Sequence, residues 1–302
     1  MTTLRLATRG SALALVQSDL VAAALRANSP DLEIEYVRIT TEGDADRTTP
    51  LSILGGRGVF VRGVEEALLR GDADIAMHSL KDMPTEDAPG LVIGAVLERA
   101  DPRDAFIGSN GRRLADLPSG ARVGTSSQRR RSLLQALRPD LEIVELRGNV
   151  DTRLRKVADG EVDGAVLAAA GLVRLGRMGE ATQIFDAMEF LPAPGQGAIA
   201  IECRADDTAT LALLAAVEHA ATRVAVDAER GFLAALGSGC TLPVGAYAQV
   251  DRELVTLRAM IADVDGERAP LIADGSAPVA QAVSLGRGLG ERLRNAAAQG
   301  ES

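Results

Sequence analysis

Apolar residues follow strand-like and helix-like spacings in turn along the first third of the chain. Short apolar runs at 4–8, 34–39 and 74–78 predict buried strands. Between them, apolar residues recur every three or four positions over 13–24 and 60–68, which predicts helices. Strands separated by helices need crossover connections, so this part predicts an α/β block around a parallel sheet.

A second block of alternating strands and helices spans 122–168, after a polar stretch at 98–104. A Pro- and Gly-rich break at 192–197 follows, and we expect the apolar run at 198–203 to return to the first block. Two crossings between similar lobes predict a hinged pair with a cleft. Sheets of this kind bind ligands at the carboxyl ends of their strands.

The pattern changes near residue 220, where a helix, two strands and a long final helix predict a small α+β region. The expected fold class is therefore α/β, with two α/β domains flanking a cleft and a small C-terminal α+β domain. The predicted domains are 1–98 together with 198–217, then 102–192, and finally 220–302.

Composition narrows the function classes. The chain has 302 residues and a net charge of −9, so we do not expect it to bind nucleic acid or membrane surfaces. Aromatic residues make up only 2%, which argues against stacking platforms for single-stranded nucleic acid. No apolar run approaches the roughly 18 residues of a membrane span, and the start has no signal-peptide pattern. We expect a cytoplasmic protein, and a monomer because the sequence shows no exposed apolar stripe.

Cysteine and histidine are too few and too scattered for a metal site. The two cysteines are Cys203 and Cys240, and the two histidines are His78 and His219. Cys203 and His78 lie in predicted strands, where we expect them to be packed in the core. No glycine-rich nucleotide-binding motif occurs, so neither a metal nor a nucleotide is expected.

Arginines gather where predicted strands end and helices begin. The set comprises Arg9, Arg129, Arg130, Arg147 and Arg153, accompanied by the hydroxyl residues Thr125 and Ser127. A helix N-terminus with hydroxyl and guanidinium donors suits a carboxylate or a phosphate. The pattern predicts a site for a multiply anionic ligand, and the alternative is a set of solvated surface arginines.

Two further side chains are candidates for chemistry. Asp82 follows a predicted strand in a turn with Ser79 and Lys81, where it could transfer a proton or stabilise a cation. The alternative is an ordinary turn aspartate beside Pro84. Cys240 lies among glycines that admit a bulky group, so its thiol could be a nucleophile or an attachment point. The alternative there is an inert thiol.

Taken in order, segments along essentially the whole chain resemble the porphobilinogen deaminase (hydroxymethylbilane synthase) family. They are ATRGS (7–11), GRGVF (56–60), HSLKDMP (78–84), DPRDA (101–105), GTSSQRR (124–130), LRGNV (146–150), PGQGA (194–198) and GSGCTLP (237–243). Each segment is weak alone, but the ordered set is specific. The resemblance implies two domains like those of periplasmic binding proteins and a third domain that carries a cofactor cysteine.

The resemblance also implies an activity. Members of the family are transferases of porphyrin and haem biosynthesis that join four porphobilinogen molecules head to tail, release ammonia and yield the linear tetrapyrrole hydroxymethylbilane. Their primer is a dipyrromethane cofactor held by a thioether, and the matching position is Cys240. Because each porphobilinogen carries an acetate and a propionate, a cleft walled by arginines would offset the charge of the growing chain.

The resemblance assigns roles residue by residue. It implies a catalytic role for Asp82, which would hydrogen-bond pyrrole N–H groups, stabilise the cation left by ammonia and relay protons. It implies cofactor binding by Cys240, Lys81, Ser79, Thr125, Ser127, Arg129, Arg130 and Arg147, and substrate binding by Arg9, Arg153, Gln196 and Phe60. Ile53 and Arg57 stand where relatives often have lysine. A second hypothesis is a non-catalytic two-lobed protein that binds a small anion, which the arginines would fit equally well.

Overall fold

The computed structural model describes residues 3–40, 61–237, 243–263 and 268–299. Contacts divide the chain into two units. The first comprises Met1–Ala100 and Ala198–Arg223, and the second comprises Asp101–Gly197 and Val224–Ser302.

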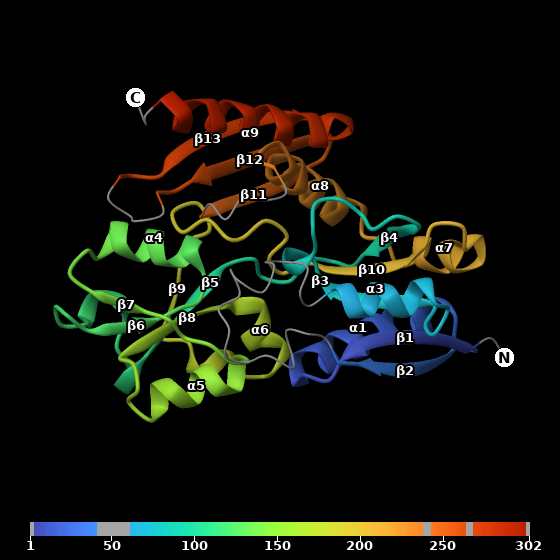
Figure 1. Ribbon diagram of the computed structural model, residues 1–302, viewed down its shortest axis with the longest axis horizontal. Coiled ribbons are helices and arrows are strands. Elements are labelled where there is room, and N and C mark those ends of the chain that lie inside the picture. Colours follow the sequence, from blue (N-terminus) through green and yellow to red (C-terminus); the bar gives the residue numbers. More distant parts are fainter. Residues whose placement is uncertain (1–2, 41–60, 238–242, 264–267, 300–302) are drawn as a thin grey trace. The chain divides into compact units, whose positions relative to one another are not determined.

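The first unit is built on a five-stranded sheet with the order β2-β1-β3-β10-β4 (Figure 1). Its strands are β1 (Thr3–Arg9), β2 (Glu33–Ile39), β3 (Ile75–Ser79), β4 (Leu91–Val96) and β10 (Ile199–Arg204). Its helices are α1 (Ala12–Asn28), α3 (Arg62–Leu69) and α7 (Thr208–Ala215), with the 3-10 turn η2 (Leu80–Asp82) after β3. The apolar faces of α1 and α7 pack on one side of this sheet, and α3 packs on the other.

The second unit contains a five-stranded sheet with the equivalent order β7-β6-β8-β5-β9. Its strands are β5 (Asp104–Gly108), β6 (Arg122–Gly124), β7 (Glu142–Val144), β8 (Gly164–Ala168) and β9 (Gln183–Ile184). Its helices are α4 (Gln128–Leu137), α5 (Val150–Ala158) and α6 (Ala169–Arg174), with 3-10 turns η3 (Ser109–Gly111), η4 (Leu114–Asp116) and η5 (Met178–Glu180). Helix α4 packs on one side of the sheet, and α5 and α6 pack on the other.

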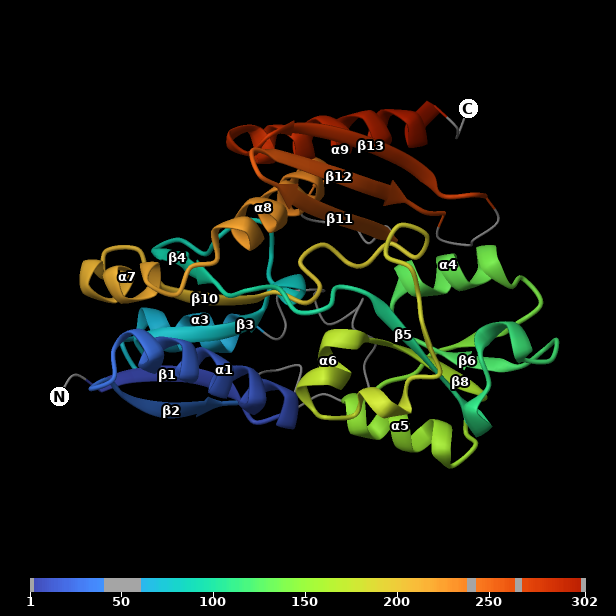
Figure 2. The ribbon, with the colours of Figure 1, turned by 180° about the vertical axis from the view of Figure 1, so that it is seen from behind.

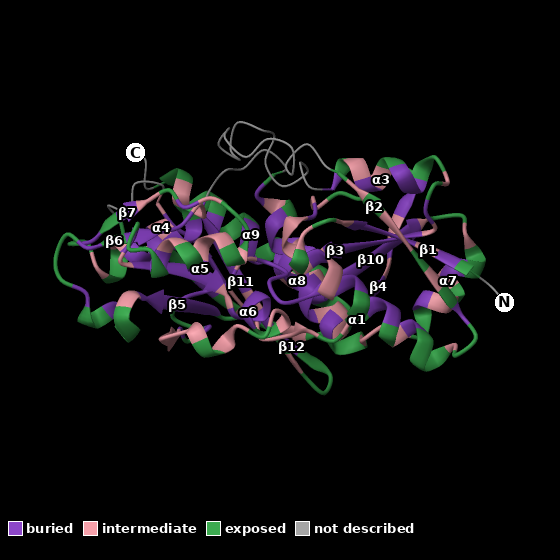
Figure 3. Cartoon of the chain, turned by 90° about the horizontal axis from the view of Figure 1, so that it is seen from below, coloured by how far each residue is buried: buried purple, intermediate pink, exposed green. Residues whose placement is uncertain are grey.

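The C-terminal part of the second unit is a three-stranded antiparallel sheet with two helices on one face (Figure 2). It comprises α8 (Ala220–Ala235) from Val224 onward, β11 (Val244–Asp251), β12 (Leu254–Ile261), β13 (Leu271–Pro278), the 3-10 turn η6 (Val279–Gln281) and α9 (Ala282–Gln299). Glycine permits the close approach of the two helices, because a Cβ on Gly286 would lie 2.0 Å from the Ala228 carbonyl oxygen. Buried positions follow the strands and the inner helix faces (Figure 3).

One strand in each five-stranded sheet runs against its neighbours. Strand β10 pairs antiparallel with β3 and β4, and β5 pairs antiparallel with β8 and β9. Both strands directly follow a crossing between the units. The predicted return of 198–203 to the first block is confirmed. The expectation of a parallel sheet holds for β1, β2 and β3 but not for β10, because β10 enters beside the carboxyl end of β3, with Ile199 opposite Ser79.

The sequence pattern missed strand β13, and its composition shows why. Its sequence LIADGSAP contains aspartate, glycine and proline, which disfavour strands. Pairing with β12 along all eight residues overrides that propensity. Among the described residues no single helix is long and apolar enough to cross a membrane, although α7 and α8, bent by 111°, pass that test as a pair.

Candidate functional site

The first unit gathers four predicted site residues at one edge of its sheet. Arg9 ends β1, Ser79 ends β3, and Lys81 and Asp82 lie in the turn η2 that follows. Strands β1 and β3 are parallel neighbours, so their carboxyl ends meet at the same edge. Phe60, the remaining residue predicted nearby, lies outside the described residues.

Buried polar contacts hold the end of β3. The Ser79 hydroxyl lies 3.0 Å from Nε2 and 3.2 Å from Oε1 of Gln17, a side chain that is 2% exposed on α1. His78 is buried as predicted, and its Nε2 lies 3.0 Å from Oε2 of the buried Glu202 on β10. The Leu80 N–H donates to the Ala198 carbonyl at 3.1 Å. Asp82 therefore follows a strand whose last residues are held by hydrogen bonds, while its own side chain is partly accessible to solvent.

The second unit gathers a matching group after β6. Thr125 is buried, and its hydroxyl accepts from the Ser127 N–H at 3.2 Å. Ser127 caps α4 by accepting from the Arg130 N–H at 3.4 Å. Ser126 donates to the Leu146 carbonyl at 2.5 Å, which ties this turn to the loop after β7. The hydroxyl residues therefore order the start of α4.

The loop after β7 positions the next two arginines. Arg147 is partly buried there, and Asn149 caps α5 by accepting from the Thr152 N–H at 2.9 Å. Arg153 donates from Nε to the Gly148 carbonyl at 2.8 Å. Because β6 and β7 are parallel, both loops lie at the same edge of the sheet.

Arg129 and Arg130 share one buried carboxylate, Asp104. Arg129 Nη2 lies 2.8 Å from Asp104 Oδ2, and Arg130 donates from Nε and Nη2 to Oδ1 at 3.1 and 2.7 Å. The Gln196 amide donates to the same Oδ1 at 2.9 Å and to the Pro102 carbonyl at 2.7 Å. Arg129 and Arg130 are 4% and 6% exposed, so the alternative of solvated surface arginines is wrong for this pair.

The neighbours of Asp104 determine its ionisation. Burial alone would raise the pKa of Asp104, but the Arg129 and Arg130 guanidinium groups and the Gln196 amide outweigh it and lower that pKa to about 2. Asp104 therefore stays ionised at neutral pH between the two guanidinium groups.

Arg174, on α6 after β8, was missed by the sequence analysis. Its Nη2 donates to the Gly197 carbonyl at 2.7 Å, and its buried Nε has no hydrogen-bond partner among the described residues. Burial lowers the pKa of Arg174 to about 10. The signal available was an arginine shortly after a strand, as at Arg9 and Arg147.

A buried carboxylate, Glu229 on α8, holds the crossing segment of the second unit. It accepts from the Gly195 N–H at 2.6 Å and from the Ala248 N–H of β11 at 2.8 Å. Gly195 has a φ of +74°, a conformation that favours glycine. Glu229, Gln196 and Arg174 together attach three successive residues of this segment to the second unit.

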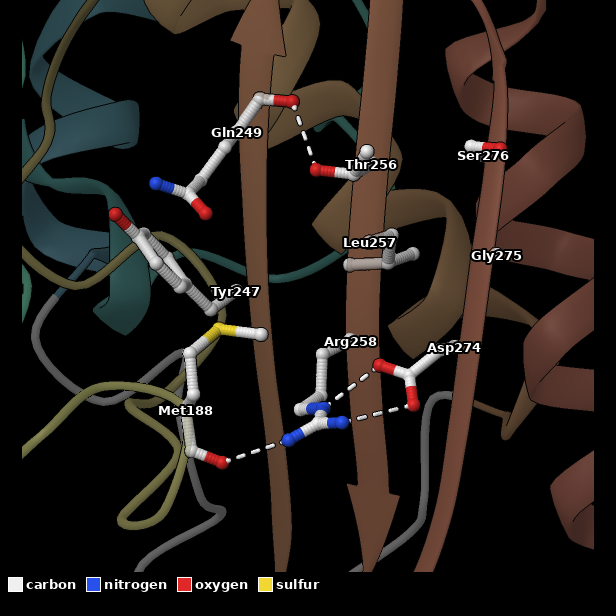
Figure 4. Close-up of a pocket in the computed structure, with 9 residues that line it drawn as sticks. All are labelled: Met188, Tyr247, Gln249, Thr256, Leu257, Arg258, Asp274, Gly275 and Ser276. Atoms are coloured by element: carbon white, nitrogen blue, oxygen red, sulfur yellow. Dashed lines mark hydrogen bonds and ion pairs between the residues drawn. The ribbon is translucent and has the colours of Figure 1, made fainter.

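An open pocket of about 340 Å³ lies on the face of the C-terminal sheet opposite its two helices, with Met188 at its edge (Figure 4). Arg258 pairs with Asp274 through two bonds of 2.7 and 3.0 Å and donates to the Met188 carbonyl at 3.2 Å. Tyr247 and Gln249 line the pocket from β11. None of the predicted site residues within the described part of the chain lines it.

The remaining predictions concern cysteine and metal. Cys240, Ile53 and Arg57 lie outside the described residues. Cys203 is fully buried, as predicted, and burial raises the pKa of its thiol to about 11. Within the ranges that the structure covers, no cluster of three or more His, Cys, Asp or Glu side chains could hold a metal ion.

Comparison with known proteins identifies the family. A model described as "Porphobilinogen deaminase, dipyromethane cofactor binding domain" matches residues 4–212, and "Porphobilinogen deaminase, C-terminal domain" matches 223–295. A porphobilinogen deaminase of Syntrophus aciditrophicus is 47% identical over 290 residues, covering 96% of this chain and 94% of its own. One of Thermobifida fusca is 52% identical over 267 residues, covering 88% and 83%.

Among solved structures, the methionine-binding protein MetQ aligns with a TM-score of 0.46 and 16% identity, over 71% of this chain and 89% of its own. The family models and the sequence relatives are deaminases, which favours the transferase hypothesis over a non-catalytic anion-binding protein. The chain belongs to the porphobilinogen deaminase family.

Proposed function

We propose that this protein joins four porphobilinogen molecules head to tail, with loss of ammonia at each joining, and releases hydroxymethylbilane. The observation that carries the proposal is the buried ion-paired group of Arg129, Arg130 and Asp104 at the start of α4, in a chain from the deaminase family. A substrate with an acetate and a propionate on each ring needs such donors at every stage of growth.

The donor set of the second unit fits a dipyrromethane cofactor, whose rings carry the same acetate and propionate groups. The guanidinium groups of Arg129 and Arg130, the partly buried guanidinium of Arg174 and the Thr125 and Ser127 turn all supply cationic or hydroxyl donors. When bound, the cofactor supplies the electron-rich pyrrole carbon to which the first substrate is joined. We assign Arg147, with Ser79 and Lys81 of the first unit, to the same carboxylates.

We assign the covalent attachment to Cys240 through a thioether. The support comes from its glycine-rich surroundings in the sequence and from the properties of the other cysteine. Cys203 is fully buried and its raised pKa keeps it a thiol, so it is a poor nucleophile.

Asp82 is assigned the proton chemistry. Its carboxylate accepts the pyrrole N–H, stabilises the positive charge left when ammonia departs, and takes up the proton released when the new carbon–carbon bond forms. Its partly exposed position on the turn η2 supports this role, because a group that exchanges protons with substrate must be reachable.

The contacts of Gln196 separate it from the other predicted substrate-binding residues. Arg9, Arg153 and Phe60 are assigned to the incoming porphobilinogen. The Gln196 amide is 1% exposed and bonded to Asp104 and Pro102, so we assign it to support of the arginine pair.

The test is the intact mass of the denatured purified protein, followed by peptide mapping. We expect an increase equal to two linked pyrrole units, located on Cys240, in the wild type and in Cys203→Ser, and no increase in Cys240→Ser. Absence of the group from Cys240 after addition of porphobilinogen or hydroxymethylbilane would overturn the proposal. We further propose that the enzyme is monomeric and cytoplasmic, which light scattering and cell fractionation test.

A further inference from the structure

A buried pair of titratable side chains that the proposed chemistry does not use lies beside the strand that leads to Asp82. Glu202 on β10 is fully buried, and its Oε2 lies 3.0 Å from Nε2 of His78 on β3, which is 5% exposed. In the described part of the chain, Glu202 Oε1 has no hydrogen-bond partner, so His78 is the one group that binds this carboxylate there. Burying a carboxylate costs free energy, and a single partner compensates only part of that cost.

The end of β3 is paired with another strand on one side only. Strand β1 pairs with β3 at Ile75 and Ala76 and no further, so residues 77–79 have β10 as their one neighbouring strand. Glu202 reaches across this ladder diagonally, from the position opposite Ala76 to His78. The pair therefore attaches the strand end to β10 through side chains, at the point where the backbone has lost its second neighbour.

The turn η2 carries this placement on to Asp82. It begins at Leu80, whose N–H donates to the Ala198 carbonyl at 3.1 Å, and the Met83 N–H closes it on the Leu80 carbonyl at 3.1 Å. Asp82 is part of this closed turn. Because the residues between His78 and Asp82 all lie in the strand or in the turn, a shift of His78 would move the Asp82 carboxylate.

We propose that Glu202 is a positioning residue for Asp82: by holding His78 it fixes the end of β3, and with it the place at which η2 presents the Asp82 carboxylate. The inference rests on the proposed function, because it takes Asp82 as the group that stabilises the cation and moves the proton. Stability alone explains the pair poorly, since apolar residues of similar volume often stabilise a fold as well as a buried charged pair does.

The main measurement is a double-mutant cycle between Glu202→Ala and Asp82→Asn. For each variant, kcat and KM for porphobilinogen are measured per chain that carries the cofactor, with the loaded fraction taken from the intact mass. We expect Glu202→Ala alone to lower kcat about tenfold with KM within about twofold, because a displaced carboxylate stabilises the transition state less well. In the Asp82→Asn background we expect the same change to lower kcat by less than about twofold, because the carboxylate it positions is already absent.

Two further variants separate placement from a general loss of stability. Glu202→Gln keeps a side chain that can hydrogen-bond to His78, so its kcat should stay within about threefold of the wild type. The matched control is Glu218→Ala, which removes another carboxylate of the first unit. Glu218 accepts from the Val96 N–H at 2.6 Å, at the end of β4, and pairs with Arg223. We expect the control to lower stability to urea and to leave kcat unchanged.

Amide hydrogen exchange gives a readout that does not depend on activity. The Leu80 and Met83 amides are protected by the two hydrogen bonds of the turn, and we expect them to exchange at least about tenfold faster in Glu202→Ala. In Glu218→Ala they should exchange as in the wild type. If Glu202→Ala does not fold, the double variant His78→Leu/Glu202→Met removes the polar contact while filling the space, and we expect the same kcat and exchange results from it.

Wild-type kcat in Glu202→Ala would overturn the inference, as would wild-type exchange at the two turn amides. A fall in kcat that is repeated in full in the Asp82→Asn background, or that is equalled by Glu218→Ala, would overturn it too. Failure of the proposed function looks different, because then Asp82→Asn would turn over normally, or the wild type would carry no cofactor and release no ammonia.

Discussion

The predicted site residues lie at one sheet edge in each unit, and the two edges differ in how far their charged side chains are buried. In the second unit, Asp104 binds two buried guanidinium groups, and the partly buried Arg174 donates to a backbone carbonyl. In the first unit, buried contacts fix His78, Ser79 and Leu80, and Asp82 follows on a partly exposed turn.

The difference matches the work each edge would do. A group that binds carboxylates gains from being fixed in advance, because no side-chain entropy is then lost when the ligand arrives. A group that moves protons must keep access to its substrate and must be able to change its charge. Asp104 cannot serve in that way, because its pKa of about 2 keeps it ionised at neutral pH.

The largest expected effect comes from Asp82→Asn. The amide keeps the shape of the carboxylate but cannot stabilise a cation or accept a proton, so we expect kcat for ammonia release to fall at least about 100-fold. Thermal unfolding should be unchanged. The matched control is Glu86→Gln, an exposed acid four residues further along. Near-normal turnover in Asp82→Asn would show that Asp82 takes no part in the reaction.

The second-largest effect is expected from Arg174→Gln, which tests the arginine site of the second unit. Loss of a charge-assisted contact should raise the KM for porphobilinogen about tenfold or more. The melting temperature should stay close to that of the wild type, because the change also removes a buried charge that has no carboxylate partner among the described residues.

Arg177→Gln is the control for Arg174, since Arg177 is 40% exposed and pairs with Asp151 and Glu180. We expect its KM to equal that of the wild type. Equal KM values for both variants would show that burial of Arg174 serves packing alone.

Low pH should reduce the stability that the ionised Asp104 contributes to the second unit. The folded pKa of Asp104, about 2, lies below the ordinary 3.8, so its contribution to the free energy of unfolding is present above about pH 4 and is lost as the pH falls through 2. That contribution is about 2 kcal/mol. Urea unfolding at pH 6 and pH 2.5 measures it, as the extra loss in the wild type relative to Asp104→Asn/Arg130→Gln. Equal losses in the two proteins would contradict the assignment.

The smallest effects compare the helix caps of the two edges. Ser11 accepts from the Ala14 N–H at 3.2 Å in the first unit, and Asn149 accepts from the Thr152 N–H at 2.9 Å in the second. We expect Ser11→Ala and Asn149→Ala each to lower the free energy of unfolding by about 1 kcal/mol. Asn28→Ala, at an exposed helix end, should cost almost nothing. A cap variant indistinguishable from Asn28→Ala in urea unfolding would mean that the cap does not stabilise its helix.

Local patterns were enough for much of the fold. Helix α4 lies within the block of alternating strands and helices predicted over 122–168, and its Ser127 cap is local in the sequence. The first β strands and the return of β10 followed in the same way. Strand β13 and the short helix α6 did not, since one has an unfavourable composition and the other is too short for a period to show.

The residues of the candidate site also differ in whether a local sequence signal marks them. Arg9, Asp82 and Arg147 could be located because a strand end followed by a turn is visible in the sequence, and parallel strands bring such ends to one edge. Asp104 carried no such signal. Its partners Arg130 and Gln196 lie 26 and 92 residues away, and nothing local states that they will meet.

The linear order of residues is therefore sufficient to establish the family, the alternation of strands and helices, and the presence of arginines and one acid at strand ends. It does not say which charges are buried or how they are paired. That depends on long-range packing, because burial and the opposing charge of a distant side chain decide whether a guanidinium group meets water, a carboxylate or a ligand.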